Sequence, residues 1–308
     1  MVNTLNKINN MATTCPEEFI KSCNEEYLSN IRQIAQRISQ DNNIKIVAIA
    51  GPSGSGKTTT AHILQENLKS AGEKVAVVSL DDFYLEAGNL PVLPDGSKDI
   101  ESVNSLDISL IKDCFEQVIK SGTVDLPHYD FKTQSRIINA KHIDIGSRGI
   151  LIVEGLHAMN PLISDLVERE NILKIYISVN SSVEDENGVQ LLSSRQVRLV
   201  RRVLRDDRFR GANATETLHR WNNVIDGERK YLYCFKDTAD IRLVTFHPYE
   251  LGVYRERFGK MRSGVNKNAP CYDYFIKTAN ALERFATISS DLVPADSLIR
   301  EFIGDLKL

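Results

Sequence analysis

Several features are missing from this sequence, and each absence argues against a class of protein. No apolar run in its 308 residues approaches the ~18 residues of a membrane-spanning helix, so we expect no membrane partner. The first residues lack the charged-then-apolar order of a signal peptide. The five cysteines are scattered and show no C-x-x-C spacing, which argues against disulfides and cysteine-based metal sites. We therefore expect reduced thiols and a cytoplasmic location.

An excess of positive charge is also missing. The sequence has 38 lysines and arginines against 41 aspartates and glutamates, a formal net charge of −3. Chains that bind nucleic acid are usually basic, so we expect no nucleic-acid partner. Hydrophobic residues (42%) and charged residues (26%) are as frequent as in an ordinary globular protein. The length suits one large α/β domain with additions or two unequal domains, and the oligomeric state stays open, a homo-oligomer included.

The most informative stretch is a glycine-rich loop between an apolar segment and a helix-favouring one. Residues 44–50 form an almost unbroken apolar run, the pattern of a strand buried on both faces of a parallel sheet. Residues 51–58, GPSGSGKT, then fit G-x-x-x-x-G-K-[ST], and residues 59–70 favour a helix. A flexible linker does not lie between a buried strand and a helix. This order therefore predicts a P-loop that binds a nucleoside triphosphate.

The residue types of this loop suit a triphosphate and its metal ion. Glycines let the backbone curl around phosphate oxygens, and the loop amides and the positive end of the helix face the anion. Lys57 can reach the β- and γ-phosphates, and the Thr58 hydroxyl can bind Mg²⁺. The predicted nucleotide contacts are Gly51, Pro52, Ser53, Gly54, Ser55, Gly56, Lys57, Thr58 and Thr59.

Two other predicted strands end in acidic residues. Residues 75–80 lead into Asp81 and Asp82, and residues 149–153 lead into Glu154. Ligands of open α/β sheets bind beyond the carboxyl ends of the strands. There a carboxylate can hold Mg²⁺ or accept the proton of an attacking hydroxyl, whereas an isolated Asp-Asp pair is more often a helix cap or a turn. Beside a P-loop, we predict a functional role for one of the two aspartates and a Mg²⁺ role for Glu154.

Arginines are concentrated between residues 195 and 210, where seven occur among sixteen residues. Arg198, Arg201, Arg202 and Arg205 are spaced i, i+3, i+4 and i+7, which predicts one face of a helix. A charged helix face is usually only solvated, and basic runs sometimes bind nucleic acid. We interpret this run as a clamp that folds over the triphosphate, because arginine forks match phosphate oxygens and stabilise charge on the transferring group.

The remaining segments are assigned by their patterns. We expect residues 1–15 to be irregular and a helix from Pro16 that ends in the polar residues 40–43. Residues 136–145 alternate apolar and polar, which predicts a small hairpin, and Pro127 excludes its aromatic-rich segment from a central strand. Further helices are expected at 106–121, 215–224, 250–257 and 272–285, and further strands at 173–179 and 241–246.

Seven segments occur in a recognisable order between residues 44 and 304. They are GPSGSGKT (51–58), SLDDFY (79–84), PHYDF (127–131), VEGLHAMN (153–160), RLVRRVLRD (198–206), RFRG (208–211) and PADSLIREFIG (294–304). In these segments the sequence resembles the uridine kinase and phosphoribulokinase group of P-loop kinases, and within it the uridine kinase-like nucleoside kinases. The phosphate-handling segments match best and the base-recognition segment least.

The resemblance implies a fold and a reaction. The fold is a five-stranded parallel sheet with helices on both faces and a small hairpin that shapes the acceptor site. The reaction is transfer of the γ-phosphoryl group of ATP to the 5′-hydroxyl of uridine or cytidine, with ATP and Mg²⁺ as cofactors and the nucleoside as acceptor. Asp81 would be the base that accepts the hydroxyl proton and would touch Mg²⁺, and Thr58 and Glu154 would hold the metal.

The resemblance also assigns the acceptor site and the arginine-rich lid. Asp99 would accept hydrogen bonds from the ribose hydroxyls, and Tyr84 and Tyr129 would flank the base. The lid covers about 195–212 and holds Arg198, Arg201, Arg202, Arg205 and Arg210. Of these, Arg202 and Arg205 are assigned to catalysis with Lys57 and Asp81, and Arg198 to the acceptor. The chain then divides into a tail (1–15), an N-terminal helix (16–43) and a kinase domain (44–308).

One position departs from the family pattern. In typical uridine kinases a histidine lies three residues after the Phe of Tyr-Asp-Phe and reads the pyrimidine edge. In this sequence that position is Gln134. A glutamine amide both donates and accepts, so pyrimidine binding survives, although a changed partner can change the preferred substrate. The alternatives are a kinase for a sugar phosphate or a vitamin precursor, and a non-catalytic nucleotide switch, which the missing Asn-Lys-x-Asp motif disfavours.

Overall fold

The centre of the molecule is a parallel sheet. A computed structural model describes residues 3–93, 96–130, 133–180 and 182–307. Its largest sheet has five strands, all parallel, in the order β10-β7-β2-β6-β3. These strands are β2 (Ile46–Ala50), β3 (Val75–Ser79), β6 (Ile150–Glu154), β7 (Ile172–Ser178) and β10 (Ile241–Val244). Each coincides with a strand predicted from the sequence, so the predicted sheet is confirmed.

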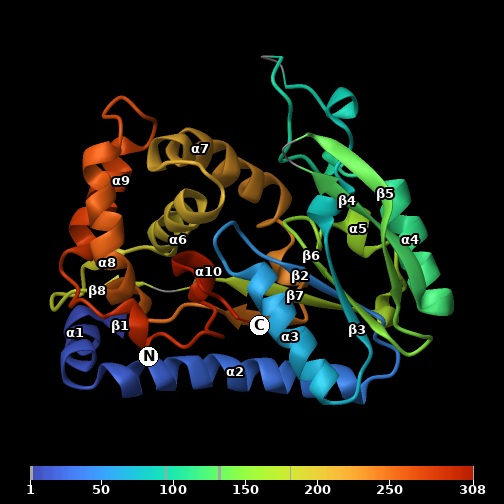
Figure 1. Ribbon diagram of the computed structural model, residues 1–308, viewed down its shortest axis with the longest axis horizontal. Coiled ribbons are helices and arrows are strands. Elements are labelled where there is room, and N and C mark those ends of the chain that lie inside the picture. Colours follow the sequence, from blue (N-terminus) through green and yellow to red (C-terminus); the bar gives the residue numbers. More distant parts are fainter. Residues whose placement is uncertain (1–2, 94–95, 131–132, 181, 308) are drawn as a thin grey trace.

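Helices cover the sheet on both faces, which explains why its strands are apolar runs (Figure 1). Val47 and Ile49 of β2 belong to one core cluster, and Ile46 and Ala48 belong to the other. Helices on the first side are α2 (Pro16–Gln40), α3 (Lys57–Ser70), α6 (Ser194–Phe209), α7 (Ala214–Tyr231), α8 (Glu250–Lys260), α9 (Tyr272–Leu282) and α10 (Arg300–Ile303). Those on the second side are α4 (Ile108–Ser121) and α5 (Pro161–Ser164).

The long helix α2 packs along α3, the helix that follows the P-loop (Figure 1). Its buried side chains follow helical spacing, and its Tyr27 hydroxyl lies 2.8 Å from the Thr60 hydroxyl of α3. The predicted helix is therefore confirmed, and it is a packed part of the core. In the part of the chain that the structure describes, no helix combines the length and apolar character needed to cross a membrane.

The first residues differ from the expectation of an irregular tail. Helix α1 (Leu5–Thr14) buries Leu5, Ile8 and Ala12, whose spacing gives one apolar face in an otherwise polar segment. The Asn9 side chain donates to Arg284 O (2.9 Å) and accepts from Ala286 N (2.7 Å). Strand β1 (Asn3–Thr4) joins a three-stranded sheet with β8 (Val183–Glu184) and β9 (Gln190–Leu192). These long-range contacts order the segment, and a local sequence pattern does not reveal them.

The predicted hairpin is present beside the sheet. It consists of β4 (Thr123–Asp130) and β5 (Ser135–Asp144), which pair antiparallel in a sheet of their own. The register shifts between Leu126 and His128, at Pro127, because a proline cannot donate to the ladder. Pro127 is thus outside the central sheet, as predicted. Phe131 of the PHYDF segment lies outside the described residues.

Candidate active site

The loop between β2 and α3 has the backbone of a P-loop. Gly54 and Gly56 have φ angles of 74° and 84°, a region that side chains with a Cβ rarely adopt. A Cβ on Gly54 would also lie 2.9 Å from the carbonyl oxygen of Arg198, so α6 approaches the loop as closely as a glycine permits. The positive end of α3 therefore begins at a tightly turned loop.

The loop amides point to an anion site. Ser53 N donates to Glu228 (2.8 Å) and Ser55 N to Pro52 O (3.2 Å). Among the described residues, the amides of Gly54, Gly56, Lys57 and Thr58 have no hydrogen-bond partner. Amides without a partner at the start of a helix favour the binding of a phosphate group.

Two of the residues predicted to contact the nucleotide, Thr59 and Ser55, have side chains that are hydrogen-bonded within the protein or buried. The Thr59 hydroxyl donates to Glu301 of α10 (2.6 Å), so only its backbone is left for a nucleotide. The Ser55 hydroxyl is buried and has no partner within the described chain. Gly51 lies against the neighbouring strand, since a Cβ there would come within 2.6 Å of Ile177 O.

Oxygen ligands gather beside Lys57. Thr58 Oγ1 lies 3.1 Å from Glu154 Oε1, at the end of β6. Burial raises the pKa of the Glu154 carboxyl, Lys57 opposes that rise, and the charge of Asp81 adds to it. Asp81 is exposed to the cleft, yet the protein crowded around it raises the pKa of its carboxyl against the opposing cations of Lys57, Arg210 and Arg205.

This group of oxygens fits Mg²⁺. The charge of Asp81 raises the pKa of Glu154, a divalent cation would relieve this like-charge repulsion, and hard oxygen ligands suit magnesium. No group of three or more His, Cys, Asp or Glu side chains in the described residues forms a metal site. A metal held by Thr58, Glu154 and Asp81 would therefore depend on phosphate oxygens for the rest of its ligands, as Mg²⁺ usually does in nucleotide sites.

The two neighbouring aspartates serve different parts of the molecule. Asp82 pairs with His128 Nδ1 (2.9 Å) and accepts from Tyr129 N (3.3 Å), so it fastens the hairpin to the end of β3. Asp81 instead faces Lys57 and the arginines, as their effect on its pKa shows. Of the two alternatives that the sequence left open, the geometry favours Asp81 for chemistry and Asp82 for structure.

The arginine run does not form one exposed face. Arg198 and Arg201 are 3% and 0% exposed, and each forks onto a buried glutamate, Glu228 (2.6 and 2.9 Å) and Glu250 (2.6 and 2.9 Å) respectively. They also donate to the loop carbonyls of Ser53 (3.1 Å) and Gly54 (3.2 Å). The expectations that these two clamp the triphosphate and that Arg198 binds the acceptor are therefore wrong. Both brace the P-loop from behind, because this face of α6 packs on it.

Three other arginines of the run, Arg202, Arg205 and Arg210, face the loop or Asp81. Arg202 donates to Ser53 Oγ (2.7 Å), and Arg205 and Arg210 are close enough to Asp81 to oppose the rise of its pKa. All three lie near the buried Asp206, at 3.3, 3.3 and 3.7 Å respectively, which holds them together. These arginines can meet charge on a transferring phosphoryl group.

Tyr84 and Tyr129 do not leave a slot for a base between them. Their ring centroids are 5.6 Å apart with the planes at 50°, whereas a base between two rings needs about 7 Å, twice the ~3.5 Å contact distance of carbon atoms. That they flank the base in another arrangement stays a prediction. They form one aromatic wall, and the Tyr84 hydroxyl donates to Ile100 O (2.8 Å), which ties that wall to the loop after β3.

A second acceptor-side carboxylate, Glu101, was not predicted. Burial raises the pKa of its carboxyl, Arg202 opposes the rise, and the charges of Glu228, Asp81 and Asp99 add to it. Glu101 thus lies near both Arg202 and Asp81. A single glutamate in a loop rich in Gly, Pro, Asp and Ser carries no local signal, and the resemblance pointed to Asp99, which is half-buried nearby.

Gln134 lies in the turn of the hairpin. Its side chain is exposed, and its φ of 53° is in the left-handed region. Residues 131–132 lie outside the described residues. Its contact with an acceptor base therefore stays a prediction.

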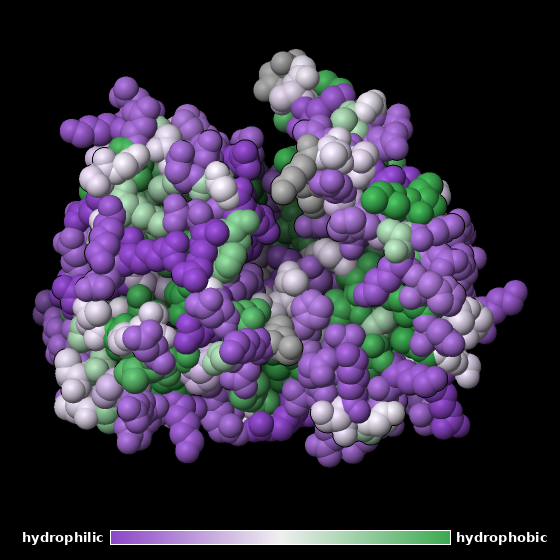
Figure 2. All heavy atoms as spheres, in the orientation of Figure 1, coloured by the Kyte–Doolittle hydropathy of each residue, from purple (hydrophilic) through white to green (hydrophobic). Residues whose placement is uncertain are grey.

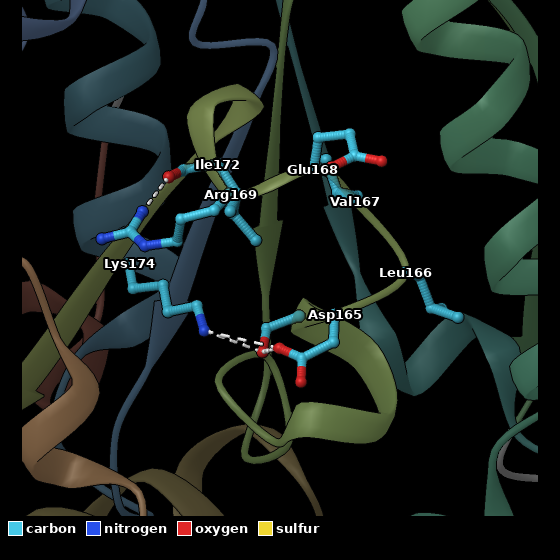
Figure 3. A pocket seen from close by; sticks show the side chains of 8 residues that line it. Asp165, Leu166, Val167, Glu168, Arg169, Ile172 and Lys174 are labelled. Carbon is cyan, nitrogen blue, oxygen red and sulfur yellow. Dashed lines mark hydrogen bonds and ion pairs between the residues drawn. The ribbon is translucent and has the colours of Figure 1, made fainter.

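Figure 2 shows the molecule hollowed between the α6–α7 side and the hairpin side, where these residues meet. A separate cavity of about 270 Å³ is lined by residues of the α5–β7 connection and β7 (Figure 3). There Lys174 donates to Ser164 Oγ (2.9 Å) and lies 3.8 Å from Asp165, and Arg169 donates to Ile172 O (2.9 Å) and pairs with Asp240. Its cations are thus paired within the protein, and no P-loop residue lines it.

Comparison with known proteins agrees with this geometry. Residues 46–247 match the family described as Phosphoribulokinase / Uridine kinase family. The chain is 27% identical over 180 residues to a uridine kinase of Clostridium novyi, covering 58% of this chain and 76% of that protein. It is 28% identical over 217 residues to the inorganic pyrophosphatase TTM2 of Arabidopsis thaliana, covering 70% of this chain and 28% of that protein.

A solved structure described as a possible uridine kinase from Bacillus stearothermophilus aligns with a TM-score of 0.44 at 18% identity, over 65% of this chain and 88% of that one. The matched family range contains the P-loop, Asp81, Glu154 and all of α6, and it extends over more than half of the sequence. The chain therefore belongs to the phosphoribulokinase/uridine kinase family of P-loop kinases, which act on small molecules.

Proposed function

We propose that this kinase transfers the γ-phosphoryl group of ATP to the 5′-hydroxyl of a pyrimidine nucleoside, uridine or cytidine. The observation that carries the proposal is the position of Asp81, which lies between Lys57 with the arginines and an acceptor side built from an aromatic wall and Glu101. The similarity to uridine kinases supports the choice of acceptor.

On the phosphate side, each group has a stated task. The free amides of the loop and Lys57 bind the β- and γ-phosphates. When bound, Mg²⁺ neutralises charge on these phosphates, and Thr58, Glu154 and Asp81 are the residues that would hold it. Arg202, Arg205 and Arg210 are fixed by Asp206 and stabilise the charge that develops on the transferring group.

Asp81 is the base in this proposal. A raised pKa makes the carboxylate a better proton acceptor than an ordinary aspartate, and Lys57 and the arginines oppose that rise. Exposed to the cleft just after β3, it lies near Lys57 of the P-loop, where an acceptor hydroxyl would attack. The proton leaves the hydroxyl for Asp81 as the new oxygen–phosphorus bond forms, and the bond between the γ-phosphorus and the β–γ bridging oxygen breaks to release ADP.

The acceptor side favours a neutral molecule with several hydroxyls. Asp99 and Glu101 can accept hydrogen bonds from ribose hydroxyls, and the Tyr84–Tyr129 wall can cover one face of a flat base. A phosphorylated acceptor would face these carboxylates with like charge. We therefore rank a nucleoside above a sugar phosphate as the acceptor. The next alternative is another neutral hydroxyl compound, because Gln134 replaces the histidine expected to read the pyrimidine edge.

An acceptor panel tests the proposal. Purified protein with Mg²⁺ and ATP is offered uridine, cytidine, purine nucleosides, a sugar phosphate and no acceptor, and ADP and the phosphorylated product are measured. We expect turnover with uridine or cytidine and almost none without acceptor. Turnover with the sugar phosphate alone would contradict the nucleoside assignment, and equal ATP consumption without any acceptor would favour a nucleotide switch.

A further inference from the structure

One helix contacts both sides of the cleft through two consecutive residues. The second of them, Glu228, is fully buried near the end of α7 and faces the P-loop. Its carboxylate accepts from Ser53 N (2.8 Å), from both Arg198 Nη atoms (2.6 and 2.9 Å) and from the Tyr233 hydroxyl (3.0 Å). With its oxygens fully engaged, Glu228 fixes the position of α7 relative to the phosphate loop.

The first of the two, Gly227, faces the acceptor side. A Cβ there would lie 2.9 Å from Glu101 Cβ and 3.2 Å from both Cγ and Oε2 of the same residue. Real Cβ atoms essentially never come as close as the first of these, and Glu101 Cβ is anchored to its backbone, so the loop would have to move. Glycine is unfavourable in a helix interior. The structural reason for this one is the close approach of Glu101.

The buried His157 lies beside the backbone of Glu101. This histidine is 4% exposed, its ring hydrogen-bonds to the backbone of Glu101, and the centroid of its ring lies 5.4 Å from that of Tyr231 of α7. Burial lowers the pKa of His157 to about 4, so the ring is neutral at physiological pH. Glu101 is thus enclosed between α7 and the segment that follows β6.

We propose that Gly227 is a positioning residue for the acceptor. By admitting Glu101 against α7, it sets the distance between the acceptor-binding carboxylate and the P-loop, which the next residue, Glu228, holds. The proposal rests on the proposed function, in which Glu101 binds hydroxyls of the acceptor. A side chain at position 227 should therefore displace Glu101 and with it the acceptor. The nucleotide should stay in place, because the hydrogen bonds of Glu228 to Ser53 and Arg198 do not involve residue 227.

The kinetic test compares two glycine-to-alanine variants. Gly227→Ala adds the Cβ that meets Glu101, whereas Gly259→Ala adds one in α8 that has nothing within 4 Å, and neither glycine has a positive φ. We expect Gly227→Ala to lower kcat/KM for the acceptor by about tenfold or more, because a small displacement of a group that positions the substrate has a large effect. Most of this loss should be an increase in the KM for the acceptor. The KM for ATP should stay within about twofold, and Gly259→Ala should change neither constant.

A double-mutant cycle separates the positioning role from a general packing defect. Glu101→Gly removes the three atoms nearest to the new Cβ, so Gly227→Ala should lower Tm in the parent background and not in the Glu101→Gly background. Hydrogen exchange should also speed up at residues 99–105 in Gly227→Ala and stay unchanged at 51–58. If Gly227→Ala alone does not fold, the double variant should.

The outcomes distinguish this inference from the proposed function. If the parent protein phosphorylates uridine or cytidine and Gly227→Ala behaves like Gly259→Ala, the positioning role is wrong and the function stands. If Gly227→Ala lowers Tm equally in both backgrounds, the contact with Glu101 is not what the glycine serves, and the inference is again wrong. If no nucleoside is phosphorylated, the proposed function fails, while the Tm cycle and hydrogen exchange still decide whether Gly227 seats Glu101.

Discussion

The two sides of the cleft are built in different ways. On the phosphate side, Arg198 and Arg201 are buried in fork-like pairs with glutamates and hold the carbonyls of the P-loop. On the acceptor side, the loop after β3 exposes Val92 and Ile100 by more than half, and Gln134 is exposed in the hairpin turn. The phosphate side is held in place by buried ion pairs, whereas the acceptor side consists of loops on the surface. The chemistry of transfer is therefore better fixed by this structure than the identity of the acceptor.

The largest effect on stability is expected at the brace. Arg201→Met removes the partner of Glu250, which is 0% exposed, and an unpaired buried charge costs about 3–5 kcal/mol in the free energy of unfolding. Urea unfolding followed by circular dichroism measures this change. A loss below about 1 kcal/mol would show that the pair is not a brace and would remove the contrast between the two sides.

Asp81 is expected to matter far more than its neighbour. Asp81→Asn should lower kcat by about 10²-fold or more with little effect on ATP binding, because the base is lost and the P-loop is intact. Asp82→Asn should lower kcat much less, since Asp82 bonds to His128 and Tyr129 of the hairpin. Steady-state kinetics of both variants decide, and greater sensitivity at Asp82 would exchange the two roles.

The pH dependence of the parent protein bears on the same residue. The pKa of Asp81 is raised, so the carboxylate is lost as pH falls at a higher pH than for an ordinary aspartate near 3.9. The acidic fall of kcat/KM should therefore lie above that value and be absent from the residual activity of Asp81→Asn. Because of this shift, the folded protein binds the Asp81 proton more tightly than the unfolded chain does. Ionised Asp81 therefore lowers the free energy of unfolding at neutral pH. Asp81→Asn should thus be no less stable than the parent at pH 7.

Arg205 should affect rate more than stability. Its side chain is 13% exposed, and it pairs loosely with Asp206 (3.3 Å) and Glu301 (3.7 Å). We expect Arg205→Ala to slow phosphoryl transfer by about tenfold or more, with a much smaller loss of stability than Arg201→Met. Arg202→Ala should behave in the same way. Equal losses of activity and stability in these variants would show that the whole run is a structural ion-pair network.

The smallest expected effect is at the acceptor side. If the Gln134 amide bonds to the edge of a pyrimidine, Gln134→Ala should cost roughly 1–3 kcal/mol in kcat/KM for that nucleoside and leave the KM for ATP unchanged. Gln134→His should retain activity and shift the ratio of uridine to cytidine turnover. Unchanged kcat/KM in Gln134→Ala would show that the hairpin turn stays away from the base.

The central sheet and the P-loop could be predicted from the sequence because their signals are local. A strand buried on both faces is an apolar run, and the glycines of the loop stand at fixed spacing. The roles of Arg198 and Arg201 could not be predicted, because their partners Glu228 and Glu250 are distant in sequence and the run has no sign of burial. Glu101 was missed for a similar reason, since its meaning depends on Gly227 and His157.

The measurement that tests the account most directly is transfer from ATP labelled in the γ-phosphoryl group to uridine and, separately, to cytidine, with the product identified by mass spectrometry. The parent protein should form the 5′-monophosphate of at least one of them in a Mg²⁺-dependent reaction. Folded Lys57→Ala should lose this activity by about 10²-fold or more, since one electrostatic contact to the transferring group contributes roughly 3 kcal/mol or more. Near-normal transfer by folded Lys57→Ala, or no labelled nucleotide product from the parent, would contradict the account.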